Sequence, residues 1–264
     1  MESSNSAAKL KVVGVGGAGG NAINDMMQSD IISDVEFIAI NTDRQDLERS
    51  LTQTRVLLGE GTGAGADPEK GKKAAKESEE AVREVLKGTD MLFITAGMGG
   101  GTGTGAAPIV AEVARGRGIL TVAVVTKPFD FEGPLKKNNA EIGIENLRKH
   151  VDTLIAIPNE KLFELPNISI TLMNAFKEAN GVLRVGIKGI SDLITKQGFV
   201  NLDFADVKAI MQDSGIAMLG FGEASGDGKS KTATEQALNS PLLEKSIEGA
   251  RKILLNITAG SDIG

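Results

Sequence analysis

The chain has 264 residues, of which 41% are apolar, enough for one large or two small globular domains. Its 35 acidic residues outnumber its 29 basic residues, and the net charge of −6 excludes a generally basic nucleic-acid-binding protein. Because the chain has no cysteine and a single histidine, it lacks the residues for disulfides, thiolate metal sites, a cysteine nucleophile or a histidine cluster.

The amino terminus and the apolar runs carry no targeting signal. Residues 1–8 are small and mostly polar, so we expect a disordered tail rather than a signal peptide. The longest apolar runs, such as residues 119–125, are far shorter than the roughly 20 residues of a membrane span. We therefore expect a soluble, cytoplasmic protein that neither inserts into a membrane nor binds nucleic acid.

Short β-branched runs alternate with helical spacing of apolar residues in the first part of the chain. This alternation is typical of a parallel sheet with helices on both faces, so we predict a Rossmann-like α/β fold. Pro108 is expected in the first turn of its helix, where proline is tolerated. The predicted strands lie at residues 11–15, 36–40, 91–96, 120–125 and 153–157, and the predicted helices at residues 21–27, 68–86, 139–150 and directly after Pro108.

The rest of the chain is predicted to hold a long helix and part of a second domain. Residues 174–195 have one apolar face and are expected to form a core helix between the two domains. Too few residues follow for an independent domain, so we expect a partial second α+β domain. Its predicted elements are a helix at 205–211, a strand at 218–224, a turn at 226–228, a helix at 241–254 and a strand that starts at Asn256.

A first glycine loop follows the first strand. Residues 14–19 read G-V-G-G-A-G, the G-x-G-x-x-G pattern that places phosphates at a helix N-terminus. Asp43 ends the second strand, about where a ribose-binding acid stands in dinucleotide-binding proteins. Taken alone, this motif leaves two alternatives open: a nicotinamide enzyme, or glycines that serve only close packing of strand and helix.

A second glycine loop, G-M-G-G-G-T-G-T-G at residues 97–105, follows another predicted parallel strand. Two such loops at one sheet edge can converge on a single polyphosphate, and threonine hydroxyls can add donors where backbone amides do not reach. A dinucleotide enzyme does not need this second loop. The pair therefore favours a single bound polyphosphate over a nicotinamide cofactor.

The second loop resembles the signature of the tubulin/FtsZ family, and the similarity to bacterial FtsZ, the cell-division GTPase, extends from about Lys11 to Gly260. The matching segments are V-G-V-G-G-A-G-G-N at residues 13–21, N-T-D at 41–43, T-K-P-F at 126–129, F-E-G at 131–133, I-P-N at 157–159, N-L-D-F-A-D at 201–206 and N-I-T-A-G at 256–260. The resemblance implies a GTP-binding domain at residues 9–173, a central helix at 174–198, and the synergy loop with a truncated C-terminal domain at 199–264.

The resemblance also implies the residues that bind GTP or GDP. Glu132 would bind ribose and Phe176 would stack on the base, although the residues alone indicate a surface acid and a core phenylalanine. Lys136 stands where the family has an arginine on the phosphate side. An accompanying Mg²⁺ or K⁺ is left open. Asn159 and Asn180 would contact guanine, and the phosphates would lie on Gly17, Ala18, Gly19, Gly20, Asn21, Gly101, Thr102 and Gly103.

The acids for hydrolysis are expected on a different segment. Asn201, Asp203 and Asp206 lie on the segment that leads into a predicted helix, and helix capping explains only one of the two aspartates. In the family, this loop reaches the nucleotide of the next subunit in a head-to-tail filament and orients the attacking water. The resemblance therefore implies that these three residues are catalytic in trans, because nothing near the glycine loops offers a base.

The implied function is that of a GTP-hydrolysing cytoskeletal protein of the bacterial division ring, located at mid-cell. Its implied partners are further copies of itself together with accessory and membrane-anchoring proteins. The open alternative is an assembly-deficient fragment that holds nucleotide without turnover. Two further departures from the family pattern are a short loop at residues 59–68 and a chain that ends within the expected second domain.

Overall fold

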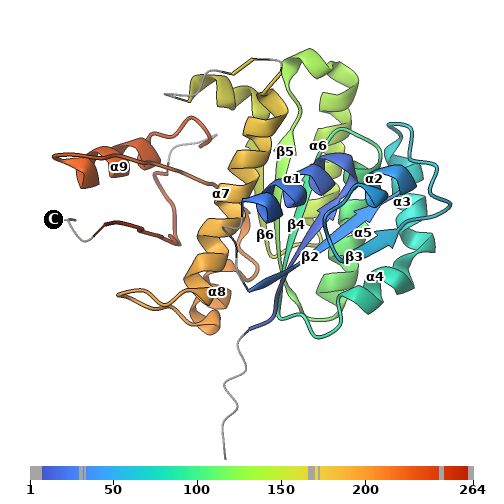
Figure 1. The fold of residues 1–264 in the computed structure, drawn as a ribbon, viewed down its shortest axis with the longest axis horizontal. Helices are drawn as coiled ribbons and strands as arrows, with labels where there is room; N and C mark the ends of the chain where they lie inside the picture. The colour runs from blue at the N-terminus through green and yellow to red at the C-terminus, as the bar shows by residue number, and fades with distance from the viewer. Residues whose placement is uncertain are drawn as a thin grey trace, which may run out of the picture.

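A computed structural model describes residues 8–29, 32, 34–165, 170–171, 173–243 and 247–260. All but the last residue of the tail expected at 1–8 lies outside these described ranges. The described chain forms an α/β structure around one sheet, with the last part of the chain extending to one side (Figure 1).

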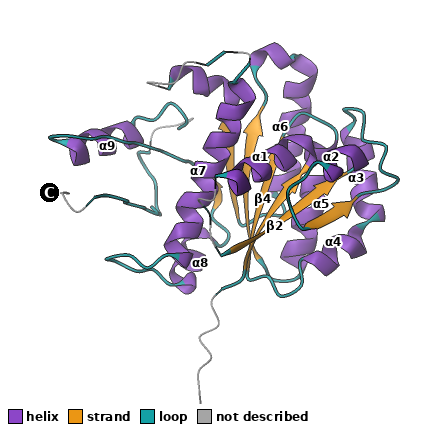
Figure 2. Ribbon diagram, in the orientation of Figure 1, coloured by secondary structure: helices purple, strands orange, loops and turns teal. Residues whose placement is uncertain are grey.

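Seven parallel strands form the sheet, in the order β3-β2-β1-β4-β5-β6-β7. The strands β1, β4, β5 and β6 are almost wholly buried, as expected for strands covered on both faces. Figure 2 shows the strands sandwiched between helices. The bounds are β1 (Leu10–Val15), β2 (Val35–Asn41), β3 (Thr54–Leu57), β4 (Met91–Gly97), β5 (Leu120–Lys127), β6 (Thr153–Pro158) and β7 (Gly215–Ala217).

The two faces of the sheet bury separate apolar clusters. One cluster joins the sheet to α3 (Pro68–Glu77), α4 (Glu79–Val85), α5 (Thr102–Gly116) and α6 (Pro134–Arg148). The other joins it to α1 (Gly16–Gln28), α2 (Arg44–Glu48), α7 (Ala175–Thr195) and α8 (Phe204–Met211). Two 3₁₀ helices, η1 (Asp130–Glu132) and η2 (Asn159–Glu164), follow β5 and β6, and α9 (Lys229–Leu238) lies in the last part of the chain.

The predicted parallel sheet is confirmed, and each of the five predicted strands lies within two residues of its predicted bounds. The long helix predicted at 174–195 is α7, and the helix predicted at 205–211 is α8. Two short elements, α2 and β3, were not predicted. β7 lies beyond the expected boundary at residue 199 and is nevertheless an edge strand of the same sheet.

Four predictions for the helices were wrong in detail. The helix predicted at 21–27 begins earlier, at Gly16, within the first glycine loop. The helix predicted at 68–86 divides at Ser78, whose backbone leaves helical geometry while its hydroxyl accepts a hydrogen bond from Gly59 N at 3.0 Å. Pro108 lies in the interior of α5 rather than in its first turn, because the second half of the glycine loop is itself helical. The helix predicted from residue 139 begins earlier, at Pro134, a residue well suited to a first turn.

The predictions for the last part of the chain were also wrong. Residues 218–224 are not a strand, because no further strand of the described chain pairs with them. The described residues within 241–254 form turns and loops, and Gly249, at φ +86°, interrupts helical geometry there. The strand expected from Asn256 is likewise absent from the described residues, and the helix α9 was missed.

Two glycines of the second loop serve close helix packing. An ideal Cβ at Gly105 would lie 2.0 Å from the Pro68 carbonyl oxygen, and one at Gly103 would lie 2.6 Å from Gly97 O. The backbones of α3 and α5 therefore approach more closely than any side chain at position 105 allows.

We predict that Gly105→Ala destabilises the protein by at least about 2 kcal/mol, because α3 and α5 must separate to admit the methyl group. Urea unfolding followed by circular dichroism measures the loss. Gly116→Ala in the same helix is the matched control, since an ideal Cβ there meets nothing within 4 Å. Equal stabilities of the two variants would contradict the packing role.

Candidate functional site

The candidate site lies at the carboxyl ends of β1 and β4. The chain leaves β1 toward β2 on one side, whereas β4 continues the sheet on the other side. A crevice at such a switch point is the usual ligand position in an open parallel sheet. Gly16 follows β1 at φ +74°, and its ideal Cβ would lie 2.9 Å from Gly103 N, so the two glycine loops are in direct contact.

The two loops border a cavity of about 290 Å³. Segments after β5 and β6 and the first turns of α7 complete its wall. The cavity therefore brings together residues that are distant in the sequence. Ten of the expected nucleotide-binding residues line it: Gly17, Ala18, Gly101, Thr102, Gly103, Glu132, Lys136, Asn159, Phe176 and Asn180.

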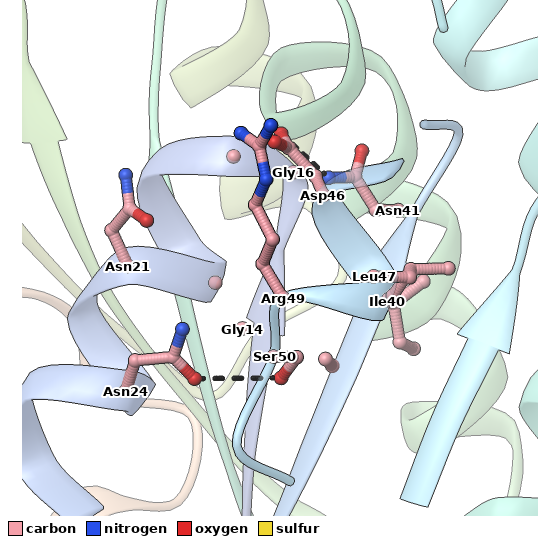
Figure 3. A pocket seen from close by; sticks show the side chains of 13 residues that line it. Gly14, Gly16, Asn21, Asn24, Ile40, Asn41, Asp46, Leu47, Arg49 and Ser50 are labelled. Carbon is pink, nitrogen blue, oxygen red and sulfur yellow. Dashed lines mark hydrogen bonds between the residues drawn. The ribbon is translucent and has the colours of Figure 1, made fainter. Parts of the chain in front are cut away.

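The other three expected phosphate-binding residues lie elsewhere. Gly20 and Asn21 border a smaller cavity of about 170 Å³ on another side of the α1 N-terminus (Figure 3). Gly19 is buried and lines neither cavity. Its ideal Cβ would lie 2.5 Å from Thr95 O. In this structure Gly19 permits α1 to pack on β4, the packing alternative left open for this motif.

The helices that begin at the loops present free backbone donors. Neither α1 nor α5 has a side-chain cap at its N-terminus, so the amides of their first turns have no side-chain acceptor. Such amides and the helix dipole favour a bound anion. The threonines are engaged within the protein: Thr102 Oγ1 lies 2.6 Å from Thr42 Oγ1, and Thr104 Oγ1 accepts from Gly99 N at 2.8 Å.

Glu132 and Lys136 form an ion pair at the cavity wall. Glu132 Oε2 accepts from Lys136 Nζ at 3.0 Å, and Glu132 Oε1 accepts from the backbone N of Phe129 at 2.9 Å. The Glu132 side chain is only 11% exposed. It is therefore a held carboxylate, not the solvated surface acid that the residue pattern alone indicated.

Asn159, directly after β6, and Phe176, in the first turn of α7, line the cavity from segments other than the glycine loops. Asn159 is 3% exposed, and its Oδ1 has no hydrogen-bond partner among the described residues. Phe176 is half-exposed and packs edge-to-face on Phe129, with ring centroids 5.6 Å apart. Phe176 is thus not the core residue that its pattern alone suggested. A buried acceptor without a donor and an open aromatic face suit a planar ligand with N–H groups.

Asp43, the candidate ribose acid of the first motif, has another role. Its carboxylate caps α2 by accepting from Gln45 N at 2.9 Å and Asp46 N at 3.4 Å, and it does not line the larger cavity. Asp46 borders the smaller cavity, where its Oδ2 accepts from Asn41 at 3.3 Å beside Arg49 (Figure 3). Asp46 and Arg49 belong to none of the motifs recognised in the sequence.

The residues expected to be catalytic do not line the cavity. Asp203 and Asp206 form a reciprocal capping box at α8: Asp206 N donates to Asp203 Oδ1 at 2.9 Å and Asp203 N to Asp206 Oδ2 at 3.1 Å. Capping thus engages both acids, whereas one was expected. Asn201 Oδ1 accepts from Gly198 N at 2.6 Å and closes the preceding turn.

These three residues lie at the far end of α7 from the cavity. α7 begins with cavity-lining residues and runs for 21 residues, about 30 Å, before the loop that holds the acids. β7, which follows α8, pairs with the first residues of β6. Asn159 follows the other, carboxyl-terminal end of β6. Figure 1 shows α8 beside the carboxyl-terminal end of α7.

Sequence reasoning missed several other lining residues. Gly16 and Gly100 belong to the glycine motifs, and Thr126 and Pro128 to the T-K-P-F segment, so a closer reading of these motifs would have found them. Met98, Ala179 and Leu183 are apolar, and their pattern is indistinguishable from that of core residues. The described residues hold no group of three or more acids or histidines placed to bind a metal ion.

The described part of the chain has no helix that is both long and apolar enough to span a membrane. Comparison with known families finds two matches. The family "Tubulin/FtsZ family, GTPase domain" matches residues 9–167. The family "FtsZ family, C-terminal domain" matches residues 215–264.

Solved structures of FtsZ are similar over most of the chain. An FtsZ dimer from M. jannaschii shares 49% identity, with a TM-score of 0.86 over 91% of this chain and 71% of the other. A W319Y mutant of the same FtsZ gives the same identity and score over 90% and 72%. CetZ2 from Haloferax volcanii, solved as a GTPγS-bound protofilament, shares 25% identity, with a TM-score of 0.70 over 82% of this chain and 67% of the other.

The GTPase-domain match covers more than half of the chain, and it coincides with the strands and glycine loops that build the cavity. The protein therefore belongs to the tubulin/FtsZ family of GTPases.

Proposed function

We propose that the protein binds GTP and GDP in the larger cavity, hydrolyses GTP to GDP and phosphate, and polymerises head to tail. The observation that carries this proposal is the placement of two groups of residues at opposite ends of α7, with the cavity at its start and Asn201, Asp203 and Asp206 beyond its end. A single chain thus holds both halves of a hydrolytic site too far apart to act together. A second copy supplies the missing half.

The base is proposed to lie against Phe176, between Asn159 and Asn180. Asn159 Oδ1 is a buried acceptor that needs a donor, and the exocyclic amino group of guanine supplies one. Adenine has no donor at that position. The amides of α1 and α5 at the other side of the cavity would hold the phosphates, with Lys136 adding a positive charge.

We predict that the protein binds GDP at least about tenfold more tightly than IDP, which lacks the 2-amino group, because the unpaired Asn159 oxygen then stays unsatisfied. Asn159→Leu, similar in size but without the amide, should bind the two nucleotides about equally. Isothermal titration calorimetry measures the four affinities. Phe199→Leu, far from the cavity, is the control that should keep the preference, and a GDP preference surviving in Asn159→Leu would contradict this role.

Hydrolysis needs a group that orients water, and the larger cavity lacks a free one among its described lining residues. Its carboxylate, Glu132, is held by Lys136 and by a backbone amide. In Asp203 and Asp206, the capping box uses one oxygen of each carboxylate. The remaining oxygens accept no hydrogen bond from the described residues and can orient water. Positioning with charge stabilisation is what phosphoryl transfer mainly requires.

The loop that holds the acids also exposes apolar side chains. Phe199 and Val200 lie at the apex of the turn closed by Asn201 and are among the most exposed large apolar residues of the described chain. An exposed apolar apex on an ordered turn is typical of a contact surface. A contact between unlike ends of two identical copies does not close and so generates a filament.

The similar structures support assembly, since the M. jannaschii FtsZ is described as a dimer and CetZ2 as a protofilament. We further propose that the filament belongs to the division ring, in the cytoplasm at mid-cell. Accessory and membrane-anchoring proteins would be its partners, and Mg²⁺ or K⁺ would accompany the nucleotide.

A second candidate is a chain that binds nucleotide without assembling. The observation that favours it is the last part of the chain, where Ile253, Leu255 and Ile257 are exposed and α9 is the one regular element described after β7. Sedimentation with GTP separates the two candidates, because only a filament pellets.

We predict that Asp206→Glu and Asp206→Asn keep the GDP affinity of the parent but lose at least about tenfold in turnover within filaments, since the first displaces and the second removes a carboxylate used only in the transition state. Glutamate is itself a good third residue of a capping box, so Asp206→Glu separates catalysis from capping. Phosphate release per pelleted mass is the measurement.

The matched control is Asp46→Asn, which removes the carboxylate at the smaller cavity on the same chain as the bound nucleotide. This variant should keep its turnover. Parental turnover in Asp206→Glu, or loss of turnover in Asp46→Asn alone, would assign the chemistry to the nucleotide's own subunit.

A further inference from the structure

Two helices begin at the cavity, and each contributes lining residues to a different side of it. α1 starts with the glycine loop that borders the phosphate side, and α7 starts with Phe176 and Asn180 on the base side. The helices pack on each other along the same face of the sheet, and their buried residues share one apolar cluster. The relative position of α1 and α7 along their axes therefore sets the spacing between the two halves of the cavity.

An ion pair joins these helices below the cavity. Arg184 Nη1 of α7 donates to Asp25 Oδ2 of α1 at 3.0 Å, across 159 residues of sequence. The side chains are 29% and 24% exposed, so water screens the pair only in part. No other side-chain hydrogen bond joins α1 to α7 in the described ranges of the chain.

The pair lies at the same depth on both helices. Asp25 is nine residues after Gly16, the first residue of α1, and Arg184 is nine residues after Ala175, the first of α7. Nine residues of helix span about 13 Å, so each partner is equally far from the first residue of its own helix. Leu183, which directly precedes Arg184, itself lines the cavity.

The other buried side chains that the two helices share are apolar. α1 contributes Ala22, Ile23 and Met26, and α7 contributes Ala179, Leu183 and Ile187, to one cluster. Apolar burial is non-directional and tolerates a small slide along the helix axis. A hydrogen-bonded ion pair has a preferred distance and direction, so it selects one axial position.

We propose that Asp25 and Arg184 are positioning residues that set the register of α1 against α7 and so match the spacing of the phosphate and base subsites to one nucleotide. This inference rests on the proposed binding of guanine nucleotide in the larger cavity. A ligand that spans both subsites gains from correct spacing, whereas a ligand that occupies one subsite does not.

The test compares GDP, which spans both subsites, with guanosine, which lacks the phosphates. Asp25→Asn and Arg184→Gln should each weaken GDP binding about two- to fivefold, the size expected for a partly exposed pair, and leave guanosine binding unchanged. The swapped double variant D25R/R184D should recover most of the GDP affinity. Calorimetry or competition with a fluorescent GDP analogue provides the affinities.

Arg115→Gln is the matched control, because Arg115 pairs with Asp213 at 3.0 Å away from the cavity and its loss should alter neither affinity. Arg184→Lys, which keeps the charge, replaces Arg184→Gln if that variant does not fold. A merely structural pair would weaken GDP and guanosine together or neither, and either result overturns the proposal. Failure of the parent protein to bind GDP would instead overturn the proposed function.

Discussion

The close approach of two glycine loops at the carboxyl edge of the sheet is the constraint on which the rest of the site depends. An ideal Cβ at Gly16 would lie 2.9 Å from Gly103 N, and one at Gly14 would lie 2.4 Å from Gly19 O. Larger residues would separate α1 from α5 and move the uncapped amides of both helices away from a common ligand. Because those amides are aimed at one cavity, the fold provides an anion site before any charged side chain is considered.

In the proposed mechanism, the length of α7 assigns nucleotide binding and hydrolysis to two copies of the chain. Its first turns close the cavity near Phe176 and Asn180, and its last turn leads to the loop of Asp203 and Asp206. From Leu183, the last residue of α7 that lines the cavity, the helix continues for about 18 Å to Thr195, which no side-chain movement bridges. In this account, nucleotide binding belongs to one subunit and turnover to the contact between two, so hydrolysis depends on assembly.

The sequence predicted the sheet well because its strands are long, apolar and β-branched, as in residues 120–125. It failed where local pattern does not decide structure. α2 and β3 are short and partly exposed, and residues 218–224 lack a pairing strand in the described chain. Ten residues that the motifs and the family resemblance proposed for nucleotide binding line the larger cavity. The capping roles of Asp43 and Asp206, the ion pair at Glu132 and the Asp25–Arg184 pair depend on contacts that the sequence does not reveal.

Mixing two inactive variants tests most directly whether a second copy completes the site. Gly100→Val places a side chain beside the cavity, where an ideal Cβ meets nothing of the fold within 4 Å, and leaves the acids intact. Asp206→Asn leaves the cavity intact. The account predicts that mixed filaments hydrolyse GTP faster than the sum of the two variants measured separately, because each bound nucleotide on an Asp206→Asn subunit meets the acids of a Gly100→Val neighbour. Turnover equal to that sum, in mixtures that pellet like the parent, would contradict the account.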